Sequence, residues 1–237
     1  MNFQEGEILC FDKPLRWTSF DVVSKIRWQL SRRLGVKRLK VGHAGTLDPL
    51  ATGVMVVCTG RATKRIDELQ AEVKEYVATL QLGATTPCFD LEKPVDQTYP
   101  TDHITEELVR EALGRFLGRI EQVPPAYSAC KVDGKRAYDL ARKGEEVELK
   151  PKVLVIDEIE LQCFNPATMQ ATIRVVCSKG TYIRALARDI GLALDSGAHL
   201  VSLRRTRVGN VRVEDCMQVE DFSAWLDEQE ITETGTE

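Results

Sequence analysis

The sequence predicts an α+β protein in which a mixed β-sheet is flanked by helices. Short runs of β-branched and aromatic residues occur among segments with apolar residues at helical spacing, but without a regular β-α-β order. The 237 residues can bury a sizeable core, and a composition of 43% apolar and 29% charged residues is ordinary for a globular protein. No internal repeat or low-complexity segment interrupts the pattern.

The first elements along the chain are predicted to be a strand, a helix and a loop. Ile8–Phe11 has the composition of a short strand. A Ser/Thr-x-x-Asp capping signal at Thr18 begins a helix whose apolar residues recur at helical spacing until Gly35. Residues 41–53, which are rich in Gly, Pro and Thr, are predicted to form a loop that precedes a buried strand at Val54–Cys58.

Helices and strands also mix in the rest of the chain. Helices are predicted over Ala62–Gln70, Thr105–Leu117 and Thr181–Leu194, and strands over Val73–Leu82, Val153–Cys163, Gln170–Cys177 and twice within residues 199–213. Residues 123–150 contain Pro-Pro, Gly and dense charge, which indicates an exposed, mobile insertion with a short helix near Lys135–Lys143. We therefore predict one domain over residues 1–213, followed by a short acidic tail at 214–237.

The charge distribution indicates a polyanionic partner despite a net charge of −4. The last 25 residues hold nine acids and no Lys or Arg, so the rest of the chain carries 32 basic and 27 acidic residues. Seven Lys or Arg and no acid lie between Asp21 and Asp48, and eight lie between Arg174 and Arg212 with only two acids. Either cluster alone is more simply a solvated helix face, but the two together favour binding to phosphate backbones.

Cysteine and histidine usage argues against disulfides and metal. The seven cysteines are scattered without a CxxC pair, which fits reduced thiols, and the three histidines lack ligand spacing. No apolar run reaches the length of a membrane span, and the N-terminus has no signal-peptide pattern. We expect a cytoplasmic protein without a metal site.

The loop Gly42–Gly53 is the most informative segment. Three glycines and a proline permit unusual backbone dihedrals, and the loop holds one acid, Asp48, between a basic helix and an apolar strand. By itself, Asp48 is more simply explained by an Asx-turn.

Further segments change this interpretation. They are Asp12–Pro14, Lys74–Tyr76, Val123–Lys131 with Gly134, Tyr138, Ala141, Arg142 and Gly144, Cys177–Asp189, and Leu203–Thr206. Together with Gly42–Gly53, they resemble, in the same order, the motifs of the TruB family of tRNA pseudouridine synthases, and the resemblance covers the chain from about residue 6 to 213. The resemblance implies that Asp48 is the catalytic carboxylate and that Arg184 pairs with it. It also implies that Tyr76 stacks on the flipped uracil, although packing of a strand tyrosine would explain that residue alone.

The resemblance further implies a set of substrate-binding residues. Tyr182 would lie beside the pocket that binds the flipped uracil, and Leu203 would be an apolar wall of that pocket. His43 would either fill the space vacated by the flipped uridine or hold the loop closed by hydrogen bonds. The other candidates are Lys13, which is expected to shape the loop beneath the site rather than touch the substrate, and three arginines that are candidates for phosphate contacts, Arg142, Arg204 and Arg205.

The implied activity is isomerisation of uridine 55 in the T-arm of tRNA, without a cofactor. The implied enzyme is a stand-alone monomer that needs no guide RNA or obligatory protein partner, and the acidic tail is too short for the RNA-binding PUA domain of many family members. The precise chemical role of Asp48 stays open between attack on C1′, attack on C6 and removal of a ribose proton. The alternatives are a non-catalytic RNA-binding or RNA-folding protein on the same scaffold and an Asp-dependent hydrolase.

Overall fold

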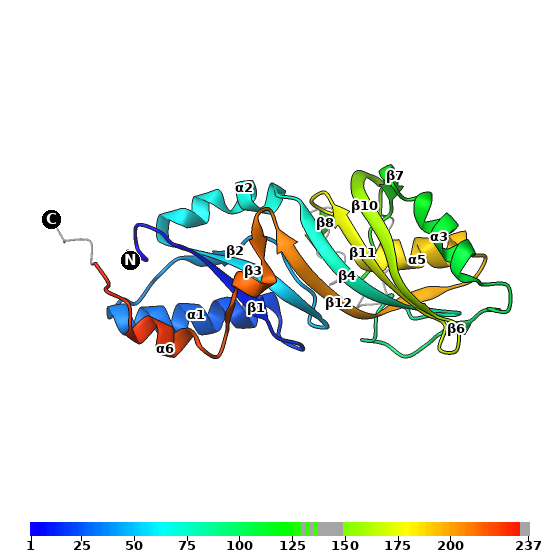
Figure 1. Cartoon of the computed structure of the whole chain (residues 1–237). Coiled ribbons are helices and arrows are strands. Elements are labelled where there is room, and N and C mark those ends of the chain that lie inside the picture. The colour runs from blue at the N-terminus through cyan, green and yellow to red at the C-terminus, as the bar shows by residue number, and fades with distance from the viewer. Residues whose placement is uncertain (129–130, 133–134, 137–148, 233–237) are drawn as a thin grey trace. The chain divides into compact units, whose positions relative to one another are not determined.

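A computed structural model describes residues 1–128, 131–132, 135–136 and 149–232 of the chain (Figure 1). The chain divides into two compact units: Met1–Lys74 with Arg204–Glu237, and Glu75–Leu203. Most of the insertion predicted at residues 123–150, including Arg142, lies outside the described residues, and so does the prediction that it is mobile.

The first unit is built on a sheet with parallel and antiparallel pairs. Strand β1 (Ile8–Lys13) pairs antiparallel with β3 (Ala51–Thr59) and parallel with β14 (Met217–Gln218). Strand β2 (Val41–His43) pairs with β3 on the edge opposite to β1. The last residues of β12 (Ala198–Val208) pair with β13 (Val211–Arg212). The strand order in this unit is β14-β1-β3-β12, so the predicted mixed sheet is confirmed.

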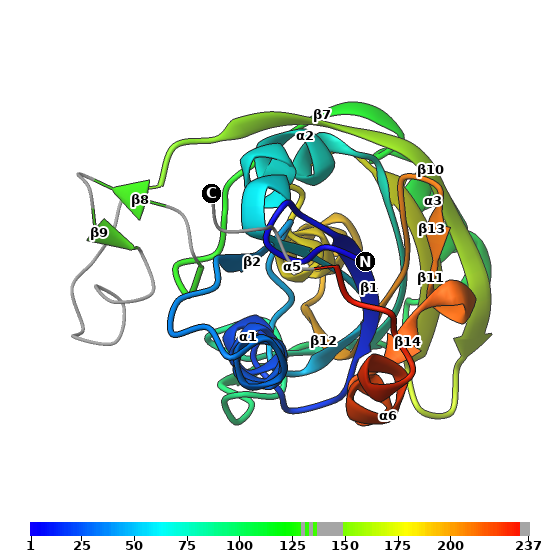
Figure 2. The same ribbon diagram turned by 90° about the vertical axis from the view of Figure 1, so that its left-hand side faces the viewer.

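Both faces of β3 are buried, because its apolar residues do not alternate with polar ones. Met55 and Val57 pack on one side with α1 (Ser19–Leu34) and α6 (Phe222–Asp227), both of which lie in the lower part of Figure 2. Val54 and Val56 face a second cluster. The helical part of the acidic tail is thus held in the core by its apolar side chains. The other short helices of this unit are η1 (Gly60–Arg65), α2 (Ile66–Ala71) and η2 (Val213–Asp215).

Helix α1 has a capping residue at each end, Thr18 before it and Gly35 after it. The Thr18 hydroxyl accepts a hydrogen bond from the Asp21 amide at 3.0 Å, and the Asp21 carboxylate accepts one from the Thr18 amide at 2.8 Å. This capping box satisfies two backbone donors that the helix leaves unpaired, and hydrogen bonds from Thr18 lower the pKa of Asp21. At the other end, Gly35 adopts φ 64°, a left-handed conformation that costs glycine little.

The second unit consists of β-strands with helices packed against them. Its strand order is β12-β4-β11-β10-β7, in which β10 pairs antiparallel with both of its neighbours. The strands are β4 (Lys74–Leu82), β7 (Gly118–Gln122), β10 (Lys152–Asn165) and β11 (Gln170–Cys177), with short pairs β5 (Ala84–Thr85) with β6 (Gln97–Thr98) and β8 (Lys131–Val132) with β9 (Lys135–Arg136). Helices α3 (Glu106–Gly114) and α5 (Ile183–Ala193) contribute buried apolar residues to its core.

Several predicted boundaries are wrong. The helix expected at Ala62–Gln70 is a 3-10 turn followed by a short helix with no buried residue, and the loop expected from residue 41 contains β2. Helix α3 ends at Gly114, so Leu117 lies outside it and is 56% exposed. Lys135–Arg136 forms a strand where a helix was expected. In the part of the chain that is described, no helix has the length and apolarity needed to cross a bilayer.

The capping box of α1 should contribute measurably to stability. Replacement of Thr18 by Ala should lower the free energy of unfolding by about 1 kcal/mol, because it leaves a helix donor without its partner. Urea denaturation followed by circular dichroism would measure this loss. Thr168→Ala, in the exposed turn between β10 and β11, is the matched control and should change stability by less than about 0.5 kcal/mol. Equal effects of the two substitutions would contradict the assignment.

Candidate active site

The loop that carries Asp48 connects β2 to β3 in the first unit and is held from below by a buried lysine. Lys13 is fully buried, and its ammonium donates hydrogen bonds to the carbonyls of Trp17 at 2.6 Å and Pro14 at 3.0 Å. A longer contact of 3.5 Å reaches the carbonyl of Pro49, the residue after Asp48. The Pro49 carbonyl also accepts a hydrogen bond from the Arg16 amide at 2.7 Å. Lys13 therefore joins the end of β1 to the loop of Asp48.

Arg205 supports the same loop from β12. Its side chain is 1% exposed, and its Nε donates to the Val54 carbonyl at 2.8 Å. The two terminal nitrogens reach the carbonyls of Gly45 at 3.1 Å and Thr46 at 3.5 Å. These contacts give Arg205 a role in holding the loop, while its contact with RNA stays a prediction. Arg204 lies beside it and makes a two-pronged ion pair with Asp12, at 2.7 and 3.2 Å.

A third support comes from the start of α1. The buried hydroxyl of Ser19 donates to the Leu47 carbonyl at 3.1 Å and accepts from the Leu47 amide at 2.9 Å. Asp48, half-buried, is the next residue, and its own carbonyl accepts the Ala51 amide at 3.0 Å. The loop is thus fixed on both sides of Asp48 by side chains from β1, α1 and β12.

Lys13 and Arg205 bring positive charge close to the loop of Asp48. Lys13 interacts electrostatically with Asp48, and this interaction partly offsets the burial and the Arg205 charge that lower the pKa of Lys13 to about 8. Two buried cations beneath a loop stabilise a negative charge on it. His43 precedes the loop, and burial followed by the Arg205 charge lowers its pKa, so the ring is neutral near pH 7. Its buried Nδ1 has no hydrogen-bond partner in the described structure.

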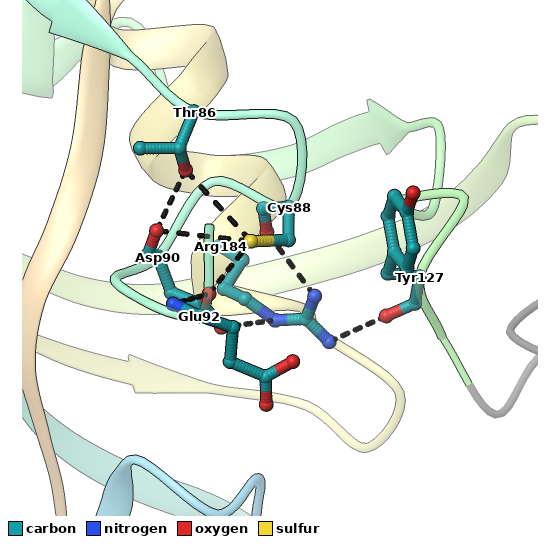
Figure 3. Close-up of polar contacts among 6 residues, drawn as sticks. All are labelled: Thr86, Cys88, Asp90, Glu92, Tyr127 and Arg184. Atoms are coloured by element: carbon teal, nitrogen blue, oxygen red, sulfur yellow. Dashed lines mark hydrogen bonds and ion pairs between the residues drawn. The ribbon is translucent and has the colours of Figure 1, made fainter. Parts of the chain in front are cut away.

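In the second unit, Arg184 lies near the start of α5 and is 6% exposed (Figure 3). Its guanidinium donates to the carbonyls of Tyr127 at 2.8 Å and Cys88 at 3.2 Å. Nε lies 3.7 Å from the Asp90 carboxylate, so Asp90 is an ion-pair partner that the sequence analysis missed. Its only sequence signal was a polar Thr-Thr-Pro turn that precedes it.

Asp90 is itself held by its neighbours. Its Oδ1 accepts hydrogen bonds from the Cys88 thiol and from the Glu92 amide, each at 2.9 Å, and its carbonyl accepts the Thr86 hydroxyl at 2.6 Å (Figure 3). Burial and the hydrogen bond to Asp90 raise the pKa of Cys88, which keeps the thiol protonated and able to donate. Asp90 therefore presents a fixed negative charge to Arg184.

The other predicted residues of this unit also have defined places. The buried amide of Gln122 accepts from the Tyr182 amide at 2.9 Å and donates to the Tyr182 carbonyl at 3.2 Å, which sets the start of α5. Tyr76 is 8% exposed on β4, and Leu203 is half-buried on β12. Asp48 belongs to the first unit and Arg184 to the second, and their pairing stays a prediction. No group of three His, Cys, Asp or Glu side chains within the described ranges could hold a metal ion.

Comparison with known proteins identifies the family to which the chain is similar. A model described as the N-terminal domain of TruB family pseudouridylate synthases matches residues 31–183, and one described as the C-terminal domain of tRNA pseudouridylate synthase B matches residues 184–234. The chain is 73% identical over 238 residues to "tRNA pseudouridine synthase B" of Phocaeicola vulgatus, covering 100% of both. It is 70% identical over 233 residues to the protein of that name in Bacteroides thetaiotaomicron, covering 98% of this chain and 97% of the relative.

Solved structures agree with these matches. The structure titled "Crystal Structure of a Cbf5-Nop10-Gar1 Complex" contains a chain with a TM-score of 0.68 and 28% identity, and the match covers 95% of this chain. It covers 56% of that chain, so this chain spans little more than half of its length. The α+β fold and the sequence matches define a pseudouridylate synthase, a class of RNA isomerases. Within that class, the chain belongs to the TruB family, as its motifs indicated.

The pKa of Lys13 leads to a testable pH dependence of stability. The folded-state pKa of about 8 lies below the ordinary 10.5, so between these values the unfolded chain binds more protons than the folded one. The free energy of unfolding of the wild type, relative to Lys13→Met, should therefore rise as the pH increases from about 8 to 10.5. Urea unfolding across this range would measure it.

The control for this experiment is the exposed Lys64, also in the first unit. Lys64→Met should follow the pH profile of the wild type. Parallel profiles for wild type and Lys13→Met would show that burial does not shift the lysine pKa.

Proposed function

We propose that this protein converts uridine to pseudouridine in tRNA, at position 55 of the T-arm loop, with Asp48 as the group that initiates cleavage of the glycosidic bond. The bond between uracil N1 and ribose C1′ breaks, the base turns, and C5 bonds to C1′ while the C5 proton is lost and N1 gains one. Atoms and electrons balance without an external reactant, so no cofactor is included. The supporting observation is the loop of Asp48, which two buried cations and Ser19 hold in place.

The remaining residues have roles that the motifs assign. Arg184 would pair with Asp48 and keep it ionised, since a guanidinium suits a carboxylate geometrically and electrostatically. Tyr76 would stack on the flipped uracil, with Tyr182 and Leu203 beside it. His43, whose lowered pKa favours a neutral ring, would occupy the space that the uridine leaves. The basic side chains Arg142 and Arg204 would contact phosphates.

We also propose that the protein acts alone in the cytoplasm, as a monomer without guide RNA. Support comes from relatives that match over nearly their whole length and bear the name tRNA pseudouridine synthase B. The Cbf5 chains, whose titles describe complexes with other proteins, are much longer than this chain.

The decisive substitution is Asp48→Asn, which removes the charge and nearly preserves the shape. With an unmodified tRNA transcript tritiated at uracil C5, wild type should release tritium from the T-loop uridine. Asp48→Asn should release it slower by on the order of 10⁴-fold, as for loss of a catalytic side chain. Asp67→Asn, an exposed carboxylate in the same unit, is the matched control and should react like wild type. If the wild type bound the tRNA but released no tritium, a non-catalytic RNA-binding protein would be favoured.

The Asp90–Arg184 pair predicts a positioning effect. Asp90→Asn should lower the single-turnover rate at saturating tRNA by roughly 10- to 100-fold, because the guanidinium loses the charge that orients it. The dissociation constant for tRNA should stay near that of wild type, which separates positioning from binding. Asp102→Asn, exposed and in the same unit, is the control. If Asp90→Asn weakened binding and left the rate unchanged, Asp90 would not position a catalytic group.

A further inference from the structure

One flank of α1 is polar and aromatic although it adjoins the loop of Asp48. Phe20, Arg27 and Ser31 lie along it at intervals of seven and four residues, which keeps them on the same side of a helix. Phe20 is 65% exposed, and the Arg27 guanidinium lies 6.0 Å from the centre of its ring. A large exposed ring with a cation over it is a stacking surface of the kind that binds nucleobases.

The same flank ends in a basic cavity of about 480 Å³. Arg27 and Ser31 form one wall, and the segment between α1 and β2 forms another with Lys37, Arg38 and Lys40. Leu39, Val41 and Ile66 add apolar surface. None of the residues that line the cavity is acidic, and four of them carry a positive charge.

The cavity has a fixed frame within the first unit. Arg27 donates to the Val41 carbonyl at 3.4 Å, and the Lys40 carbonyl accepts the Gly60 amide at 2.8 Å. Gly42 lines the wall where a Cβ would lie only 2.8 Å from the end of the Ile66 side chain, so a larger residue there would displace that side chain. The charged groups thus project from a backbone that is hydrogen-bonded in place.

The cavity and the loop of Asp48 lie at opposite ends of the same pair of elements. Ser19, at the start of α1, is hydrogen-bonded to Leu47, whereas Ser31 lines the cavity. Twelve residues of helix separate them, which is roughly 18 Å at the helical rise. Strand β2 begins at Val41, which lines the cavity, and ends at His43, just before the loop. An extended strand of nucleic acid that reaches Asp48 can therefore follow the α1 flank.

We propose that this cavity binds a backbone phosphate of the substrate RNA, and that Phe20 stacks on a base between that phosphate and the reacting uridine. This inference rests on the proposed function for the identity of the RNA. Four like charges around one cavity repel one another, and a phosphate relieves that repulsion. Backbone phosphates meet this need at any sequence, so the site contributes affinity and register, and base identity is read elsewhere.

The test compares two double variants that remove the same charge from the same part of the chain. Arg38→Gln with Lys40→Gln removes two of the three cations of the exposed cavity wall. Lys25→Gln with Arg33→Gln removes two cations from the opposite flank of α1 and is the matched control. Fluorescence anisotropy with a tRNA transcript, titrated from low to high KCl, gives the dissociation constant and its salt dependence.

The cavity double variant should weaken binding at low salt by about 10-fold and reduce the slope of log K against log salt by roughly 1 for each lost phosphate contact. The control pair should change the slope by less than half as much. Phe20→Ala should weaken binding by roughly 10-fold without changing the slope, because stacking is not ionic. Equal slopes for the two double variants, or wild-type binding by the cavity double variant, would overturn the proposal.

Tritium release by wild type is measured in the same reactions. Release by wild type together with wild-type binding by the cavity double variant would refute the cavity and leave the proposed function intact. Binding that depends on the cavity, without release, would refute the proposed function and support the cavity as an RNA site.

Discussion

The burial of Lys13 and Arg205 beneath the loop of Asp48 is the constraint on which the rest of the first unit depends. A buried cation is tolerated only when carbonyls or a carboxylate replace its water, and both side chains spend their donors on main-chain carbonyls. Those carbonyls belong to the loop and its flanks, so the loop cannot move without exposing unsatisfied charge. The requirement extends to Gly53, where φ is 110° and a Cβ would collide with the Arg205 backbone. The loop of Asp48 is therefore positioned by electrostatics and hydrogen bonds from Lys13 and Arg205.

The second unit also buries a cationic side chain, but with a different set of partners. Arg184 is also buried, and two carbonyls and the Asp90 carboxylate satisfy it. Asp90 is in turn fixed by a thiol that burial keeps protonated. A guanidinium held in this way keeps its orientation and its charge, which are the two properties that a partner of a catalytic carboxylate needs. Gln122, which clasps the backbone of Tyr182, fixes the helix from which Arg184 projects.

The two basic clusters of the sequence turn out to differ in kind. The one from Arg174 to Arg212 is largely occupied inside the protein. Arg174 is ion-paired with Glu75 and Glu158, Arg204 with Asp12, and Arg205 is bonded to carbonyls. The cluster between residues 25 and 40 is mostly exposed and lines a cavity without acids. Most cations from Arg174 to Arg212 therefore hold the fold, although the Arg204 side chain stays partly exposed. Most of those between residues 25 and 40 direct their charge to solvent, where an RNA phosphate can meet it.

The sequence by itself determined the α+β class, helix α1 with both of its caps, the main strands, and the family with Asp48 in its motif. These follow from signals that act within a few residues, such as a capping box, a left-handed glycine or a run of β-branched residues. The tertiary structure alone decided that Arg205 is an internal support, that Asp90 is a partner of Arg184, and that β2 forms where a loop was expected. Each of these depends on groups far apart in the chain, because the cost of burying a charge is set by whichever distant atoms the fold brings to it.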